Sequence, residues 1–119
     1  MSESQAPADV AVAFIEAFGR QDIDTLARYL AEEVVFESPR VRLTGARAVA
    51  EAVGQFAQAV IGVKILASLG DGEQALITYN METGPFGTIR AVDHLVVRDG
   101  KIVADTLVFD TGALGQGTD

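Results

Sequence analysis

The sequence has no cysteine and a single histidine, His94. The lack of cysteine excludes a disulfide framework and a thiolate metal site, and one histidine excludes metal centres that need several. The sequence also lacks a glycine-rich phosphate loop and a nucleophile paired with a base. We therefore expect neither a metal nor a cofactor.

Basic residues are also few: nine Lys and Arg stand against 17 Asp and Glu, and the net charge is −8. Such a charge repels phosphate backbones and anionic lipids, so we expect no nucleic-acid partner. Glu16 and Lys64 interrupt the longest apolar stretches, well short of the ~18 residues that a membrane span requires. Because the N-terminus has no signal-peptide pattern, we expect a cytoplasmic protein that does not enter the membrane.

Apolar residues make up 49% of the 119 residues and charged residues 22%, which is typical of a globular domain with its own core. We predict a single domain over residues 1–119, with loose tails at 1–8 and 111–119. Three segments have apolar residues at the three- and four-residue steps of an amphipathic helix. They predict helices over residues 10–18, capped by Asp9 and ended by Gly19, 23–31, capped by Asp22, and 46–59.

Residues rich in β-branched and aromatic side chains predict the strands. The first covers residues 34–38 and stops at Pro39, and the others cover 62–69, 73–83, 88–98 and 101–110. Tight-turn sequences separate the last four strands, which should therefore be antiparallel neighbours. The order of elements predicts an α+β fold in which a curved antiparallel sheet buries one face under three helices.

Asp93 is the first candidate functional residue. Strand alternation places it in an inner row with four apolar residues, Ile89, Ala91, Leu95 and Val97. An acid in such a row is costly unless it is protonated, paired or hydrogen-bonded. Two interpretations stay open: a functional acid in a pocket, or a core acid satisfied by its neighbours.

Asp105 is the second candidate, and its position depends on the last hairpin. A strict two-residue turn at Asp99-Gly100 makes Asp93 face Thr106, whereas a three-residue loop with a glycine bulge makes it face Asp105. We prefer the second register because it buries Val103, Leu107 and Phe109, the larger apolar set. Asp93 and Asp105 then lie side by side and share a proton; in the alternative, Asp105 is a solvated strand residue.

The remaining predictions on the strands concern Tyr79 and Met81 on the inner row and the apolar residues of the outer row. Tyr79 and Met81 fall on the inner row; Tyr79 either offers its hydroxyl to a ligand or, as we favour, is packed core with a tethered hydroxyl. Met81 is favoured as core. The outer row is unusually apolar for a wet sheet face, which indicates a homodimer through it; it contains Val92, Val96, Ala104 and Val108.

Four short motifs resemble the nuclear transport factor 2-like superfamily, and within it ketosteroid isomerase and the SnoaL-like group. They are residues 18–24, 35–39, 92–95 and 99–103, in the family's order along residues 10–110. The resemblance implies a cone-shaped, curved mixed or antiparallel sheet covered by three N-terminal helices, which is a cystatin-like roll. It also implies an apolar pocket under the helices and a dimer through the outer sheet face.

The resemblance assigns catalytic positions one by one. Asp93 matches an aspartic acid that ketosteroid isomerase keeps protonated in apolar surroundings. Phe14 stands where that enzyme has a tyrosine, and Ser38 stands where it has an aspartate base. In epoxide hydrolases of this fold, Ala91 would replace an arginine and Leu107 a second aspartate.

The sequence thus predicts a protein that acts on a small apolar or polycyclic molecule by general acid–base chemistry, through isomerisation, cyclisation or epoxide opening. Asp93 and Asp105 are the predicted catalytic residues. Two alternatives stay open: a binding protein without catalysis, and a structural or dimerisation module whose cavity is packed shut. The predicted ligand-binding residues are Phe14, Phe36, Ser38, Val53, Tyr79, Met81, Leu107 and Phe109.

Overall fold

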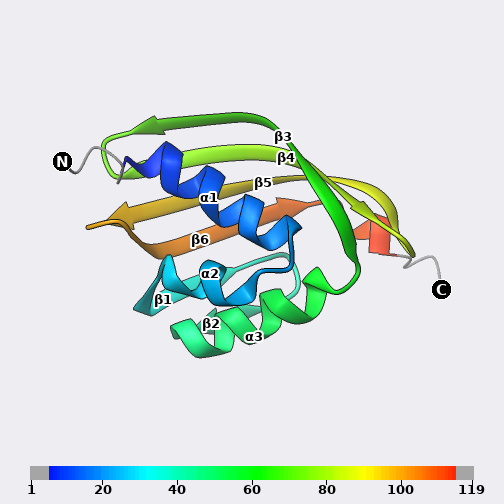
Figure 1. Ribbon diagram of the computed structural model, residues 1–119, viewed down its shortest axis with the longest axis horizontal. Helices are drawn as coiled ribbons and strands as arrows, with labels where there is room; N and C mark the ends of the chain where they lie inside the picture. Colours follow the sequence, from blue (N-terminus) through cyan, green and yellow to red (C-terminus); the bar gives the residue numbers. More distant parts are fainter. Residues whose placement is uncertain (1–5, 115–119) are drawn as a thin grey trace.

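In the computed structural model, which describes residues 6–114, the first helix, α1 (Pro7–Gly19), lies across one face of a six-stranded sheet (Figure 1). The predicted cap at Asp9 is wrong, and residues 7 and 8 of the predicted tail 1–8 belong to this helix. Proline at the first helical position has a suitable φ and needs no N–H there. The helix therefore begins at Pro7, its N-cap Ala6 gives no side-chain cap, and Asp9 lies in the first turn.

The end of α1 fits closely against the sheet. A Cβ added to Gly19 would lie 2.6 Å from Cγ2 of Val63, so the missing side chain permits this approach. The next residue but one, Gln21, has a φ of 61° and donates its side-chain amide to the carbonyls of Ala57 and Val60, at 2.8 and 3.0 Å. One side chain thus ties the turn after α1 to the turn before the third strand.

The second helix, α2 (Ile23–Arg28), has the predicted cap: Oδ1 of Asp22 accepts from the backbone N–H of Thr25 at 3.2 Å. The helix ends three residues earlier than predicted. Tyr29 accepts a backbone hydrogen bond from Ile102, and Leu30 pairs with the same residue, so the chain enters the first strand at this point. Pairing with a distant strand here overrides the local helical pattern.

The third helix, α3 (Ala46–Ala57), follows a short strand that the sequence analysis missed. That strand, β2 (Arg42–Thr44), has three residues and pairs antiparallel with β1 (Leu30–Glu37). Its Arg-Leu-Thr sequence is too short for a period-two pattern to stand out from a polar loop. Gly45, with a φ of 101°, makes the step from β2 into α3.

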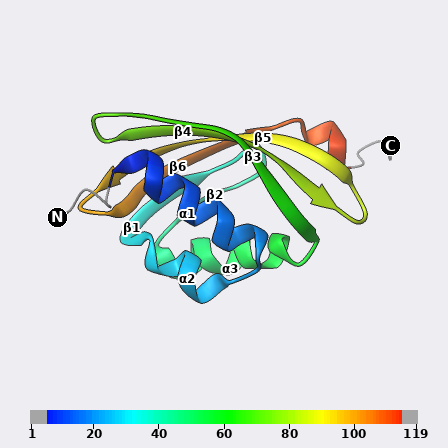
Figure 2. The ribbon, with the colours of Figure 1, turned by 45° about the horizontal axis from the view of Figure 1, so that its top comes forward.

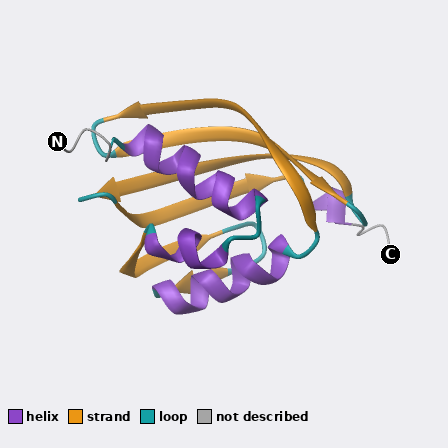
Figure 3. Cartoon of the chain, viewed as in Figure 1, coloured by secondary structure: helices purple, strands orange, loops and turns teal. Residues whose placement is uncertain are grey.

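The sheet runs in the order β2-β1-β6-β5-β4-β3, and only β1 and β6 are parallel neighbours within residues 6–114. The long strands curve over the three helices, which all lie on one face (Figures 2 and 3). The predicted α+β fold, with a mixed curved sheet under three N-terminal helices, is confirmed. The remaining strands are β3 (Val60–Asp71), β4 (Gln74–Thr83), β5 (Gly87–Arg98) and β6 (Lys101–Phe109).

The last hairpin has neither of the two predicted registers. Asp99 and Gly100 both have positive φ, at 53° and 77°, and form a two-residue turn that pairs Arg98 with Lys101. An extra residue in β6 then shifts the pairing, so that Val96 lies opposite Ala104. The bulge is therefore in β6 beyond the turn and not at the glycine. Asp93 lies opposite Leu107, and Asp105 lies opposite Leu95.

The two faces of the sheet differ in burial. On β5 every second residue from Ile89 to Val97 is buried against the helices, while the intervening residues are half-buried or exposed. On the outer face, His94 is hydrogen-bonded to the side chain of Gln74 at 2.8 Å. None of the helices in the described part of the chain is long and apolar enough to cross a membrane.

The predicted C-terminal tail is partly wrong as well. Residues Thr111–Leu114 form a short 3-10 helix, η2, after β6. The rest of that predicted tail, 115–119, and residues 1–5 of the other lie outside the described residues.

Candidate functional site

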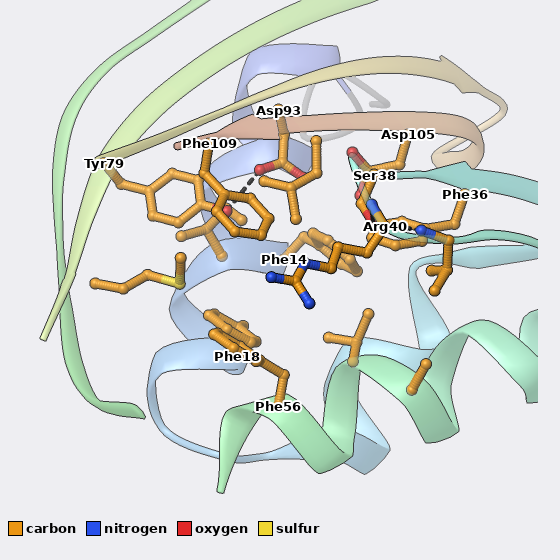
Figure 4. A pocket seen from close by; sticks show the side chains of 16 residues that line it. Phe14, Phe18, Phe36, Ser38, Arg40, Phe56, Tyr79, Asp93, Asp105 and Phe109 are labelled. Atoms are coloured by element: carbon orange, nitrogen blue, oxygen red, sulfur yellow. Dashed lines mark hydrogen bonds between the residues drawn. The ribbon is translucent and has the colours of Figure 1, made fainter. Parts of the chain in front are cut away.

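A cavity of about 270 Å³ lies between the inner face of the sheet and the helices. Ten residues that the sequence analysis named, the two acids and the eight ligand-binding candidates, all line it (Figure 4). The cavity is not packed shut, which removes the main premise of the third alternative. Its other lining residues are Ile15, Phe18, Arg40, Val41, Ala52 and Phe56.

Two buried acids, Asp93 and Asp105, lie on the sheet side of the cavity and form its acidic end. Asp93 on β5 is 2% exposed, and the hydroxyl of Tyr79 on β4 donates to its Oδ1 at 2.6 Å (Figure 4). Tyr79 pairs in register with Ala91, two residues from Asp93, so the contact runs diagonally across the strand pair. The Tyr79 hydroxyl is thus hydrogen-bonded to a carboxyl of the protein at the cavity wall.

Asp105 on β6 is the second acid at this end. The bulge in β6 changes which residues face inward, because an extra residue moves the following side chains to the opposite face. Asp105 and Leu107 consequently turn to the cavity, while Thr106 is exposed. Asp105 is 1% exposed, and neither of its carboxyl oxygens accepts a hydrogen bond from a donor group within residues 6–114. The neighbouring carboxyl of Asp93 is the group with which it can share a proton.

Burial and proximity change the titration of all three groups. Burial, followed by the charge of Asp93, raises the pKa of Asp105 well above its ordinary value. Burial also raises the pKa of Asp93, while the neighbouring Asp105 and Tyr79 act in the opposite direction. The pKa of Tyr79 is raised well above 10.0, first by burial and then by the charge of Asp93, so this hydroxyl remains a donor.

Aromatic rings form the helix side of the cavity. Phe14 and Phe18 project from α1 and Phe56 from α3 (Figure 4). The rings of Phe18 and Phe56 are stacked, with centroids 6.5 Å apart and planes 3° from parallel, and Phe86 continues the stack at the same spacing. Phe18 and Phe56 are not among the predicted pocket residues, although their helical spacing from Phe14 and Val53 is a signal that could have found them.

The loop after β1 provides the remaining polar groups. Ser38, at the position of a base in ketosteroid isomerase, accepts from the backbone N–H groups of Arg40 and Val41, both at 3.3 Å. Its hydroxyl oxygen therefore holds the turn. Arg40 is exposed and lines the cavity; no ion pair involves it in the part of the chain that the structure describes. Among the described residues that line the cavity, Arg40 is the one cation.

Metal ligation is not supported by the geometry. Among residues 6–114, no three His, Cys, Asp or Glu side chains come together in a way that could hold an ion. Within the described chain, the acids that line the cavity are Asp93 and Asp105, and the Tyr79 hydroxyl already bonds to one oxygen of Asp93.

An open, curved six-stranded sheet with three helices on its inner face and an acid-walled apolar cavity defines a pocket-bearing α+β domain of the nuclear transport factor 2-like kind. The SnoaL-like domain family matches residues 11–104, and the chain belongs to this family. No curated protein matches the chain.

Solved structures agree with this assignment. A protein from Kribbella flavida DSM 17836 is 34% identical, with a TM-score of 0.89 over 95% of this chain and 93% of its own. An epoxide hydrolase from M. tuberculosis, described as LEH-like, is 26% identical, with a TM-score of 0.74 over 91% and 85%. A protein with a cystatin-like fold from Silicibacter pomeroyi DSS-3 is 22% identical, with a TM-score of 0.79 over 93% and 83%, which shows the fold alone.

Proposed function

We propose that the chain is an enzyme that transfers protons to and from a small apolar molecule, with Asp93 and Asp105 as its acid–base pair. The observation that carries the proposal is the buried carboxyl of Asp105, which lines an apolar cavity and accepts no hydrogen bond from a donor group within residues 6–114. An unpaired buried polar group is costly. Such a cost is typical of functional sites, where a ligand supplies the missing partner.

The cavity favours a small substrate. Its volume of about 270 Å³ lies just below the range of roughly 300–1,000 Å³ that is usual for drug-sized ligands. The reaction classes that fit are isomerisation, cyclisation and epoxide opening, since each needs one group to donate a proton and another to accept one. The epoxide hydrolase from M. tuberculosis supports the last of these.

Catalysis is tested by comparing turnover with affinity. Small ketones and epoxides are offered to the wild type, and the variants Asp93→Asn and Asp105→Asn are assayed on any compound that reacts. Loss of one member of an acid–base pair should lower turnover by about 100-fold or more while affinity changes only a few-fold. Glu37→Gln is the matched control, because Glu37 is an exposed acid on β1 outside the cavity.

A non-catalytic ligand-binding protein is the second candidate. The observation that favours it is the replacement of two catalytic groups of ketosteroid isomerase, by Phe14 and by Ser38, whose hydroxyl oxygen is engaged in a turn. If ligands bind to the wild type without reacting, and both Asn variants lose affinity, this candidate replaces the enzyme.

We also propose that the chain forms a homodimer through an outer patch, defined as Leu76, Val92, Val96, Ala104 and Val108. Val92 pairs with Val108, and Val96 pairs with Ala104, so the patch is continuous across β5 and β6. Leu76 and Val108 are 49% and 58% exposed in the single chain. Clustered exposed apolar residues of this kind are typical of a protein interface.

A further inference from the structure

Asp93 and Asp105 stand in different hydrogen-bonding environments although both are buried. Asp93 accepts from the Tyr79 hydroxyl at 2.6 Å, within the range of about 2.5–2.7 Å that is usual when a hydroxyl donates to a charged oxygen. Asp105 accepts from no group in the described chain. A carboxylate gains from a donor, whereas a carboxylic acid does not depend on one. The negative charge is therefore better stabilised on Asp93.

The other elements around the pair do not change this comparison. The lining residues from α1 and α3 are all apolar, and β1 contributes Phe36. The remaining charged group among the lining residues is Arg40, which is exposed on the loop after β1. Among the described residues that line the cavity, the Ser38 hydroxyl is the remaining neutral donor near the pair; its oxygen accepts from two backbone N–H groups of the turn, and no hydrogen bond joins it to Asp105.

We propose that Tyr79 is a positioning residue that fixes where the proton of the acid pair rests: Asp93 is the carboxylate, and Asp105 is the carboxylic acid, whose O–H can turn either to Asp93 or to a ligand in the cavity. This assignment is the reverse of the one that the resemblance to ketosteroid isomerase implies for Asp93. It concerns the resting protein and does not require a ligand.

The assignment defines a ligand class, and this part rests on the proposed function. A carboxylic O–H that turns from Asp93 to the ligand donates a hydrogen bond, and the carboxylate beside it repels a second negative charge. The polar end of the ligand should therefore be a neutral oxygen acceptor, such as a ketone or an epoxide oxygen, on an apolar body. A carboxylate at that end would meet repulsion, and a pure hydrocarbon would leave the Asp105 hydroxyl without a partner.

Carboxyl-resolved carbon NMR tests the resting state without any ligand. In the wild type the Asp93 signal should titrate at lower pH than the Asp105 signal. Tyr79→Phe keeps the ring and removes the donor, so the apparent pKa of Asp93 should rise by about one to two pH units. Tyr29→Phe is the control, because Tyr29 does not line the cavity, and it should leave both signals unchanged.

Two results would overturn the assignment. One is an Asp105 signal that titrates below that of Asp93 in the wild type; the other is an unchanged Asp93 titration in a folded Tyr79→Phe variant. If Tyr79→Phe does not fold, the order of the two wild-type titrations decides alone. A merely structural Tyr79 would alter the melting temperature without altering that titration.

A matched ligand series tests the ligand class by naphthyl fluorescence. 2-Acetylnaphthalene has the oxygen, 2-ethylnaphthalene replaces that group with an apolar one of similar size, and 2-naphthoate carries a charge. The ketone should bind about five- to tenfold more tightly than the hydrocarbon, because one neutral hydrogen bond contributes about 1 kcal/mol. Asp105→Leu should abolish this preference, and Asp105→Asn, which still donates through its amide, should retain much of it.

The outcomes separate the two proposals. Equal binding of the ketone and the hydrocarbon to the wild type would contradict the ligand class while leaving the pocket proposal intact. Failure of all three compounds to bind would count against the proposed function, and the NMR titration would then still decide the position of the proton.

Discussion

The two faces of β5 show how one strand can serve two purposes. Its inner row from Ile89 to Val97 is buried and carries Asp93 to the cavity, while the outer row contains Val92 and Val96 and remains partly exposed. Side chains alternate between faces at each residue, so neighbouring positions on β5 have different environments. The inner face of β5 is therefore packed core with one acid at the cavity, whereas the outer face leaves apolar side chains partly exposed.

Adjacent residues on opposite faces of β5 should differ strongly in how much they stabilise the fold. Leu95→Ala removes a fully buried side chain and should lower the free energy of unfolding by about 2–5 kcal/mol. Val96→Ala removes a half-buried one and should cost less than about 1 kcal/mol in the monomer. Urea denaturation of both variants measures the difference. Similar losses in the two variants would contradict the separation of the faces.

Formation of the proposed homodimer should depend on the outer face of the sheet and not on its inner face. Val108→Asp places a charge in the outer patch, where its symmetry mate would meet it, and should weaken the dimer by about 100-fold or more. Unfolding of the monomer should change little, because Val108 is already 58% exposed. Light scattering from micromolar to millimolar concentration measures the mass, with Ile61→Asp, at an exposed apolar site on the edge strand β3, as the control. A monomeric wild type at micromolar concentration would count against the proposed dimer.

The acids of the inner face should give stability a distinctive pH dependence. Burial raises the pKa of Asp105 and of Asp93 in the folded chain, so the folded chain keeps protons that the unfolded chain releases near pH 4. The free energy of unfolding should therefore fall as pH rises from about 4 through the raised pKa, by at most about 1.4 kcal/mol per pH unit for each proton. Below pH 4 both states are protonated, and this dependence disappears.

Denaturation from pH 4 to 8 tests this dependence. Asp105→Asn cannot ionise and should flatten the slope. Glu37→Gln changes an exposed acid on the opposite face of the sheet and should leave the slope as in the wild type. The prediction fails if Asp105→Asn and the wild type have parallel stability profiles.

Most of the fold could be predicted from the sequence because the pattern is local. The helical steps in α1 and α3, the cap at Asp22 and the turn sequences between the last four strands each depend on a few neighbouring residues. The prediction errors lie where contacts between residues far apart in the sequence determine the secondary structure. Leu30 joins a strand because Ile102 lies beside it, and β2 forms because β1 offers an edge.

The sequence could predict which residues belong to the candidate site, but not how they are arranged. The preference for burying apolar side chains correctly predicted that Leu107 and Phe109 turn inward. The register that turns them inward, however, depends on a bulge in β6 that no glycine in the sequence marks. The contact between Tyr79 and Asp93 depends on the register of β4 against β5, which places the two residues on a diagonal. A single sequence shows neither the position of the bulge in β6 nor the register of β4 against β5.

The smallest expected effect concerns the mouth of the cavity, where the inner face meets solvent. Arg40 is the cationic residue that lines the cavity, and no ion pair holds it within residues 6–114. A ligand with a neutral oxygen toward Asp105 and a carboxylate at its other end should gain from Arg40 by only about two- to fivefold in affinity, since exposed ion pairs are weak. Arg40→Gln should remove this gain, and Arg42→Gln, whose side chain does not line the cavity, should not. Titrations at low and high salt measure the effect against the corresponding neutral amide; an equal loss of affinity for both compounds would mean that Arg40 contributes packing and not charge.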